Sequence, residues 1–258
     1  MRYPGKATLL THIYNEEYLL PFWLEHHKKI FDDLVVVDYN STDSSLEICK
    51  RMWPECRIIP SRNKDFDAEF VDHEMMDIEN GIPGIKVVLN TTEFLFCKRP
   101  LKEIFGNSSS PISYEINSYS AYSKKNYDIR SLNELLSKAL NEDVVYHSDR
   151  GIRQIFTFPH GAYKPAGRHD WANPRSFQDD MFILWFGFYP MNEHQLKRKL
   201  QISTRMSARD KSIRRGFQHL FTQEEMLNIN TKKAETGVPL RMIKPSFVQL
   251  IKKNHIAH

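Results

Sequence analysis

Short apolar runs alternate with longer amphipathic segments over the first hundred residues of the chain. The apolar runs predict buried strands at Ala7–Ile13, Leu34–Asp38, Arg57–Ile59 and Ile85–Leu89. The segments between them predict helices from Glu16 to Ile30, from Ser44 to Trp53 and from Phe66 to Glu79. An order of this kind predicts an α/β fold, with a mostly parallel central sheet and helices on both of its faces.

The second of these helices has a defined start. Ser44 and Glu47 have the spacing of a capping box, in which each side chain bonds the backbone N–H of the other residue. We therefore expect the helix to begin at Ser44.

Ligands of parallel α/β sheets bind beyond the carboxyl ends of the strands. Functional side chains are therefore expected directly after each predicted strand. These positions are His12–Glu17, Asp38–Asp43, Ser61–Asn63 and Asn90–Glu93.

The pattern is weaker after Pro111. A short helix is predicted at Leu132–Leu140, a strand at Arg153–Phe158 and a long functional loop at Pro159–Pro174. Beyond Tyr189-Pro190 the chain reads as helical, with helices near Glu193–Thr204, Ala208–Leu220 and Gln223–Asn230. We predict an α/β domain over residues 1–190 and a helical extension over residues 191–258, packed on the same domain.

The composition is that of an ordinary globular protein, with 41% hydrophobic and 26% charged residues among 258. No apolar run is long enough to span a bilayer, and the first residues show no signal segment, so a cytoplasmic location is expected. The three cysteines suggest neither a disulfide framework nor a thiolate metal site. His26-His27 is interpreted as the end of an amphipathic helix, not as a pair of metal ligands.

The net charge of +4 is mild, but the basic residues are unevenly distributed. Between Lys197 and Arg215 there are eight lysines or arginines and one aspartate. This run is suited to a diphosphate, an acidic glycan, a lipid-linked pyrophosphate or peripheral contact with an anionic membrane, and it also fits a solvated helix face. Nucleic acid is not expected, because no binding module with interleaved aromatic residues is present.

Two strand-end clusters offer groups that recognise a nucleotide. Thr11–Glu17 presents an aromatic ring and an amide, although Asn15 also suits a helix N-cap. Asp38 can accept a hydrogen bond from a base or a ribose hydroxyl, whereas Asn40, Ser41 or Asp43 can cap the helix that follows.

Taken together, "H-x-YNE-x-x-LLPFWLEHH" and "VVVDYNSTDSS" resemble the opening of family-two-like glycosyltransferases, in particular the branch related to family 92. The resemblance covers residues 7–96 specifically and residues 150–220 more loosely. It implies a GT-A (Rossmann-like) fold, a UDP- or GDP-sugar donor, a saccharide hydroxyl as acceptor and inversion at the anomeric carbon. A nucleotidyltransferase on a similar sheet is disfavoured, because no glycine-rich loop follows the first strand.

The resemblance also assigns donor-binding positions. His12, Tyr14 and Glu16 would surround the nucleobase, and Asp38 would contact the base or ribose with Asn40 beside it. Arg62 would approach the base or the phosphates. Asn90 and Thr92 would lie at the diphosphate.

The chain departs from that family at the metal motif, where Asn90-Thr91-Thr92-Glu93 replaces D-x-D-E. The missing carboxylates normally hold the Mg²⁺ or Mn²⁺ that neutralises the leaving diphosphate. Three alternatives remain open at this point. Glu93 holds a metal with a remote ligand such as His160 or His169; cationic or hydrogen-bonding side chains replace the metal; or the chain is a catalytically inactive nucleotide- or glycan-binding module.

An inverting enzyme needs a general base for the acceptor hydroxyl. The resemblance places this base on an aspartate that opens a helix about ninety residues after the metal motif. Asp180, and next Asp179, fit that distance. Alternatively both simply cap the helix, and Glu93 is the competing base if no metal binds.

The loop from His160 to Arg175 is the predicted acceptor region. His160, His169 and Trp171 suit stacking on a sugar face and hydrogen bonding to its hydroxyls, and Arg168 or Arg175 suits a phosphate. The simpler alternative is a surface loop with a structural tryptophan.

Overall fold

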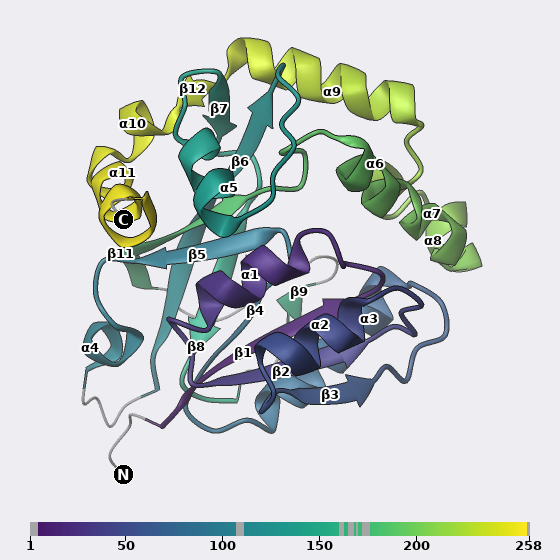
Figure 1. Cartoon of the computed structure of the whole chain (residues 1–258). Coiled ribbons are helices and arrows are strands. Elements are labelled where there is room, and N and C mark those ends of the chain that lie inside the picture. Colours follow the sequence, from purple (N-terminus) through teal and green to yellow (C-terminus); the bar gives the residue numbers. More distant parts are fainter. Residues whose placement is uncertain are drawn as a thin grey trace.

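Parallel strands from the amino-terminal part of the chain form one side of a mixed sheet (Figure 1). The computed structural model describes residues 5–106, 111–159, 163–164, 168, 170–171 and 176–256. β1 pairs in parallel with β2 and β4, and β2 pairs in parallel with β3. Their bounds are Ala7–Ile13 (β1), Asp33–Asp38 (β2), Arg57–Pro60 (β3) and Ile85–Val88 (β4). All the strands predicted in this part of the chain are confirmed.

The two faces of these strands carry different helices. Leu9 of β1 and Val36 of β2 lie in the core that includes residues of α1 (Leu20–His27) and α2 (Ser45–Met52). Leu10 and Val35, which are adjacent to these residues in each strand, pack instead against α3 (Ala68–Asn80). Successive residues of a strand point to opposite faces, so the continuous apolar runs are buried on both sides. The predicted α/β architecture, with helices on both faces, is confirmed.

The capping box predicted at the start of α2 does not form. Ser44 is the N-cap residue, as expected, but its side chain makes no capping hydrogen bond. Its backbone N–H donates to Glu17 Oε2 (3.1 Å) on the loop after β1. A contact between two loops therefore replaces the local one.

The other side of the sheet is mostly antiparallel. The complete strand order is β12-β7-β6-β8-β4-β1-β2-β3, and β11 pairs with β5 and β6. The added strands are β5 (Glu93–Cys97), β6 (Ser113–Ser123), β7 (Val144–His147), β8 (Ile152–Phe156), β11 (Ser176–Trp185) and β12 (Val238–Pro239). A separate short ribbon pairs β9 (Tyr163–Lys164) with β10 (Asp170–Trp171). Two short helices, α4 (Leu101–Phe105) and α5 (Leu132–Ala139), complete this part.

The helix predicted to open at Asp179 and Asp180 is wrong, because both residues lie in β11. The register of β11 against β6 shifts between Phe177 and Phe182, so the two aspartates lie in an irregular part of the strand. The apolar residues that follow, Met181 to Leu184, are buried between β5 and β6. A short apolar run fits a buried strand as well as a helix, which explains the error.

The carboxyl-terminal part is helical, as expected. It comprises α6 (Glu193–Leu200), α7 (Ile202–Arg205), α8 (Ala208–Ser212), η1 (Phe217–His219), α9 (Gln223–Thr236), α10 (Leu240–Ile243), α11 (Pro245–Ile251) and η2 (Lys252–Ile256). Leu196 and Met226 pack with Tyr122 of β6, and Phe247 joins the main core. The extension is thus attached to the sheet by apolar contacts. Among the described residues, no helix is long and apolar enough to cross a membrane.

Candidate functional site

The loops that follow β1 and β2 are locked together by hydrogen bonds. The backbone N–H groups of Thr42 (2.7 Å) and Asp43 (3.3 Å) donate to Asn15 Oδ1. In return, the N–H of Asn15 donates to Ser41 Oγ (3.1 Å), and that of Glu17 donates to Asp43 Oδ2 (3.1 Å). Asn15 has a φ of 51°, a left-handed conformation that asparagine tolerates better than most residues. The two sequence motifs therefore build one rigid edge at the carboxyl ends of the parallel strands.

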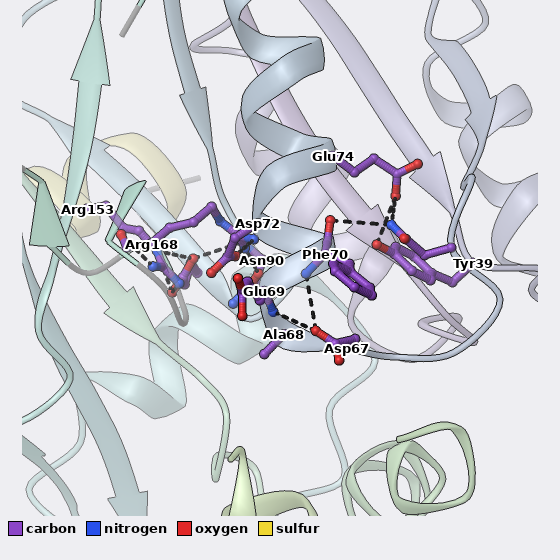
Figure 2. A network of polar contacts seen from close by, with 12 residues as sticks. Tyr39, Asp67, Ala68, Glu69, Phe70, Asp72, Glu74, Asn90, Arg153 and Arg168 are labelled. Carbon is purple, nitrogen blue, oxygen red and sulfur yellow. Dashed lines mark hydrogen bonds and ion pairs between the residues drawn. The ribbon is translucent and has the colours of Figure 1, made fainter. Parts of the chain in front are cut away.

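His12, at the end of β1, contacts aromatic side chains. Its ring centroid is 5.8 Å from that of Tyr39 and 6.5 Å from that of Phe66. Burial, followed by the nearby Arg168 and Arg153, lowers the pKa of His12 to about 3, so the imidazole is neutral. The Tyr39 hydroxyl donates to Glu74 Oε2 (3.0 Å), as Figure 2 shows. A neutral histidine between aromatic rings is suited to contact with a planar base.

Glu16 connects three segments of the chain at this edge. It is buried, and its carboxylate accepts hydrogen bonds from the Thr91 hydroxyl (2.7 Å) and from Arg198 Nη1 (3.0 Å). Thr91 follows β4, and Arg198 lies on α6. Helix α6 is thereby held against the carboxyl edge of the sheet.

Glu93 is the centre of a buried ion-pair group. Its side chain is 0% exposed, and it accepts from Arg153 Nη2 (2.7 Å), Arg153 Nε (3.0 Å) and Arg150 Nη2 (3.2 Å). The Asn90 N–H also donates to Glu93 Oε2 (2.8 Å). Burial alone would raise the pKa of Glu93, but the charges of Arg153 and Arg150 hold it well below its usual range. Glu93 is therefore ionised and fully engaged.

Arg168 extends this group toward α3. It donates to Asp72 Oδ1 (2.7 Å) and to Asn90 Oδ1 (2.9 Å), and its backbone oxygen accepts from Arg153 Nη1 (3.1 Å). Figure 2 shows Arg153 and Arg168 side by side, next to Asp72 and Asn90. Arg168 therefore binds a carboxylate of the protein itself.

Arg150 and Lys199 lie on a pair of aromatic rings. The Arg150 guanidinium is 4.4 Å from the ring centroid of Trp185. Lys199 Nζ is 5.8 Å from the Trp185 ring and 3.9 Å from that of Phe188. Burial, then Arg198 and Arg150, lower the pKa of Lys199 to about 7. His219 shares this environment, since burial and then Lys199, Arg198 and Arg150 lower its pKa to about 4.

The residues in the place of the metal motif do not fit a divalent cation. Both Glu93 oxygens accept from arginine, Asn90 Oδ1 accepts from Arg168, and the Thr91 hydroxyl donates to Glu16. Mg²⁺ and Mn²⁺ need oxygen ligands whose lone pairs are free. In the described part of the chain, no three His, Cys, Asp or Glu side chains form a group that could hold a metal.

The other predicted donor residues are placed differently. Asp38 Oδ1 accepts a hydrogen bond from the Ser41 N–H (3.0 Å), and Asn40 is exposed. The Tyr14 ring packs against the Arg205 guanidinium, whose Cζ lies 4.6 Å from the ring centroid. Thr92 is buried and its backbone oxygen accepts from the Phe186 N–H (2.8 Å). The Arg62 side chain pairs with Asp77 on the outer surface of α3, away from the arginine group around Glu93.

Asp179 and Asp180 lie away from this edge. β5 runs antiparallel to β11, with Glu93 opposite Trp185 and Cys97 opposite Met181. At about 3.3 Å per residue, Cys97 lies roughly 13 Å along the strand from Glu93, and the aspartates lie beyond it. Asp180 accepts from Arg99 Nε (3.1 Å), and Asp179 pairs with Lys244 and Lys98. The structure therefore does not bring these aspartates to the site.

The predicted acceptor residues are only partly described. His160, His169 and Arg175 lie outside the described residues. Trp171 is in β10, but its side chain is also outside them. Their roles remain predictions.

Arg150 and Arg153 were not predicted as site residues, whereas Lys199 belongs to the basic run that was expected to suit a diphosphate. Arg153 opens the strand predicted at Arg153–Phe158 and is buried in the structure, where an arginine requires an anionic partner. Nothing local marks Arg150, which lies in the turn between β7 and β8.

No protein-family profile and no curated protein sequence matches the chain significantly. Solved structures give weak matches. S. aureus TarS matches with a TM-score of 0.39 and 13% identity, over 78% of this chain and 65% of that one. Glucosyl-3-phosphoglycerate synthase from Mycobacterium tuberculosis, in complex with Mn²⁺, UDP and glucosyl-3-phosphoglycerate, matches with a TM-score of 0.31 and 15% identity, over 45% of this chain and 44% of that one. 4-Diphosphocytidyl-2C-methyl-D-erythritol synthase from Anaerococcus prevotii matches with a TM-score of 0.28 and 10% identity, over 58% of this chain and 69% of that one. Likeness at this level assigns neither a family nor an activity to the chain.

Proposed function

We propose that this chain is a glycosyltransferase of the GT-A type, which moves a sugar from a nucleoside diphosphate sugar to a saccharide hydroxyl. The observation that carries the proposal is the convergence at one sheet edge of the two resemblance motifs, the Asn90–Glu93 segment and a group of arginines and lysine. Ligands of parallel α/β sheets bind at this edge. A diphosphate is the part of the donor that such cations recognise.

The proposed nucleotide end of the donor lies along β1 and β2. His12 is neutral and faces Tyr39 and Phe66, which suits stacking against a base. Asp38 ends β2 and remains partly exposed, so its second carboxylate oxygen suits a ribose hydroxyl. Arg62 is not part of this proposal, because it pairs with Asp77 on the outside of α3.

The helical extension takes part in the proposed site through α6. Arg198 binds Glu16, and the adjacent Lys199 lies near Trp185 at the end of β11. Residues 191–258 would thus complete the donor site built by residues 1–190. Inversion at the anomeric carbon is proposed on the resemblance alone. Asp179 and Asp180 are not proposed as the base, since they lie at the other end of the β5–β11 pair.

The test is donor turnover by the whole chain. The protein would be incubated with a panel of UDP- and GDP-sugars, with and without saccharide acceptors, and released UDP or GDP would be quantified. Release that depends on enzyme and increases with an acceptor is the expected result. Nucleotide binding without release for any donor would contradict transfer and support the alternative of a nucleotide-binding module.

A matched pair of variants compares the loss of a cation at the proposed site with the loss of one elsewhere on the surface. Arg150→Gln removes a guanidinium at the sheet edge, whereas Arg130→Gln removes an exposed one that pairs with Asp128. We expect release to fall at least about ten-fold in the first variant and to be unchanged in the second. Equal activity of the two variants would refute the location of the site.

A further inference from the structure

We propose that Arg150 and Lys199 bind the donor diphosphate directly, as a metal-independent anion site that replaces the carboxylate–metal clamp. This inference rests on the proposed function for the identity of the donor. The anion site itself rests on the geometry around Trp185. A glycosyl donor of any sugar would present the same pyrophosphate group to it.

The carboxylate expected to hold a metal, Glu93, already binds arginine. Glu93 is bound by Arg153 and Arg150, and the side chains of Glu93 and Arg153 are at most 2% exposed. A metal at Glu93 would have to break this buried ion pair, which is strongly unfavourable. Glu93 thus acts as a positioning residue for the arginines.

Among the described side chains, the site holds more cations than carboxylates. Each buried carboxylate of the group pairs with an arginine: Glu93 with Arg153 and Arg150, Asp72 with Arg168, and Glu16 with Arg198. Lys199 makes no hydrogen bond or ion pair within the described part of the chain, and its close contacts are the rings of Phe188 and Trp185. Asp149, the neighbour of Arg150 in sequence, pairs with Lys233 instead.

Arg150 and Lys199 are partly exposed, so a ligand can reach them. Arg153 and Arg168 are buried, but the Arg150 side chain is 21% exposed, and Lys199 is half-buried. Both cations lie on Trp185, and aromatic rings attract cations but neutralise none of their charge. Lys199 has no counterion among the described residues, and Arg150 shares the Glu93 carboxylate with Arg153, so this partly desolvated pair carries excess positive charge and suits an anion.

Sugar transfer requires that the leaving diphosphate be stabilised. The acceptor hydroxyl oxygen bonds to the anomeric carbon and releases its proton to solvent, while the bond between that carbon and the diphosphate oxygen breaks. The electron pair of the broken bond remains on the diphosphate, which gains negative charge. Fixed cations next to that oxygen stabilise the charge without reorganisation. Arg150 and Lys199 supply two such cations.

The experiment measures binding of inorganic pyrophosphate to the whole chain by calorimetry, in EDTA and then in excess Mn²⁺. We expect binding in EDTA that Mn²⁺ does not strengthen, at least about ten-fold weaker binding by Lys199→Met, and unchanged binding by Lys197→Met. Lys197 is the matched control, because it lies on the same helix but is exposed. Lys199→Arg, which keeps the charge, should retain most of the affinity. Binding that requires Mn²⁺, or that is equal in wild type and Lys199→Met, would overturn the inference.

Competition identifies the source of the anion and separates the two proposals. Displacement of pyrophosphate by UDP or GDP supports a donor site, and pyrophosphate that neither nucleotide displaces contradicts it. If pyrophosphate binds without metal and this binding depends on Lys199, but no nucleotide sugar is turned over, the anion site is supported and the proposed transferase activity is refuted. If turnover requires Mn²⁺ and is unaffected in Lys199→Met, the proposed transferase activity is supported and the metal-independent anion site is refuted.

Discussion

Arg153 and Glu93 form a buried ion pair at the carboxyl edge of the sheet, with Arg153 Nη2 2.7 Å from Glu93 Oε1 and neither side chain more than 2% exposed. Arg153 lies in β8, and Glu93 is the first residue of β5. The ion pair therefore joins two strands that are not hydrogen-bonded to each other. The same carboxylate binds Arg150. This pair therefore fixes the position of the cation that we assign to the donor.

Glu93→Gln should destabilise the fold, because it removes the buried carboxylate that Arg153 and Arg150 share. Breaking a buried pair in this way typically costs about 3–5 kcal/mol. The free energy of unfolding in urea measures the effect. Glu142→Gln is the control, because Glu142 pairs with Arg241 on the exposed surface and its loss should be hard to detect. A Glu93→Gln protein as stable as wild type would show that the pair is not formed.

Asp180→Asn and Asp179→Asn should leave donor turnover unchanged. Both aspartates pair with cations at the end of β5 remote from Glu93, and their partners Arg99 and Lys244 do not belong to the site. The rate of UDP or GDP release is the measurement, with Arg150→Gln as the positive control. A loss of activity in Asp180→Asn with normal stability would restore the aspartate as the base and contradict the location of the site.

The sequence predicted the parallel half of the fold, because β1, β2 and β4 are mostly apolar runs buried on both faces, although β3 at the edge is only partly buried. It did not predict β6, although β6 pairs with β7, β8 and β11. The reason is that Ser118, Ser120 and Ser123 are buried in β6, so its pattern of polar residues reads as a loop. Burial of these serines is a property of the complete sheet and cannot be inferred from the segment.

The same distinction applies to the site. Strand-end positions such as Asn15, Glu16 and Asn90 follow from the order of strands and helices. The contacts of Glu93 do not, because Arg150 and Arg153 are 57 and 60 residues away in sequence. Their approach depends on the antiparallel pairing of β8 with β4 and β6, which no local pattern specifies.

Asn15→Ala should lower both the stability of the fold and the affinity for a nucleotide. The reason is that Asn15 Oδ1 accepts hydrogen bonds from two backbone N–H groups of the loop after β2. Asn40 is a matched control. It also has a left-handed backbone, with φ of 63° against 51°, but it is exposed and its side chain makes no hydrogen bond in the described structure. Each alanine variant should lose about 1 kcal/mol through backbone strain. Asn15→Ala should lose about 1–2 kcal/mol more through its hydrogen bonds. Equal losses in the two variants, measured by urea unfolding, would contradict the interlocking of the loops.

The stability of the protein should decrease as the pH falls below about 6.5. The Leu95 N–H donates to His27 Nε2 (3.1 Å), so Nδ1 carries the proton that is donated to the Trp23 oxygen (2.9 Å). Burial lowers the pKa of His27 to about 3, from 6.5 in an unfolded chain. Between these values the unfolded chain binds the extra proton and the folded protein does not, so stability falls by up to about 1.4 kcal/mol per pH unit for this histidine.

Free energies of unfolding at pH 7 and pH 5 test this in wild type, His27→Gln and His73→Gln. The His73 side chain is 53% exposed, and its replacement should not change the pH dependence. His27→Gln should be less stable at pH 7 but should lose less stability on going to pH 5. An identical pH dependence in all three proteins would rule out His27 as a contributor.

The affinity for a nucleotide sugar should decrease as the pH rises above about 7, because Lys199 then loses its proton in the free protein. Besides burial, the groups that set its pKa of about 7 are Arg198 and Arg150, which lower it, and Glu16, which raises it. A bound diphosphate adds negative charge and raises the pKa of Lys199, so binding takes up a proton at pH 8 and is weaker there than at pH 6. A nucleotide sugar is the suitable probe, because its diphosphate is a diester without a proton to lose in this range. Calorimetry in two buffers of different ionisation enthalpy measures the proton uptake. Lys199→Arg should bind without it, since arginine stays charged throughout. Uptake of the same size in Lys199→Arg and wild type would mean that another group titrates and that Lys199 does not contact the diphosphate.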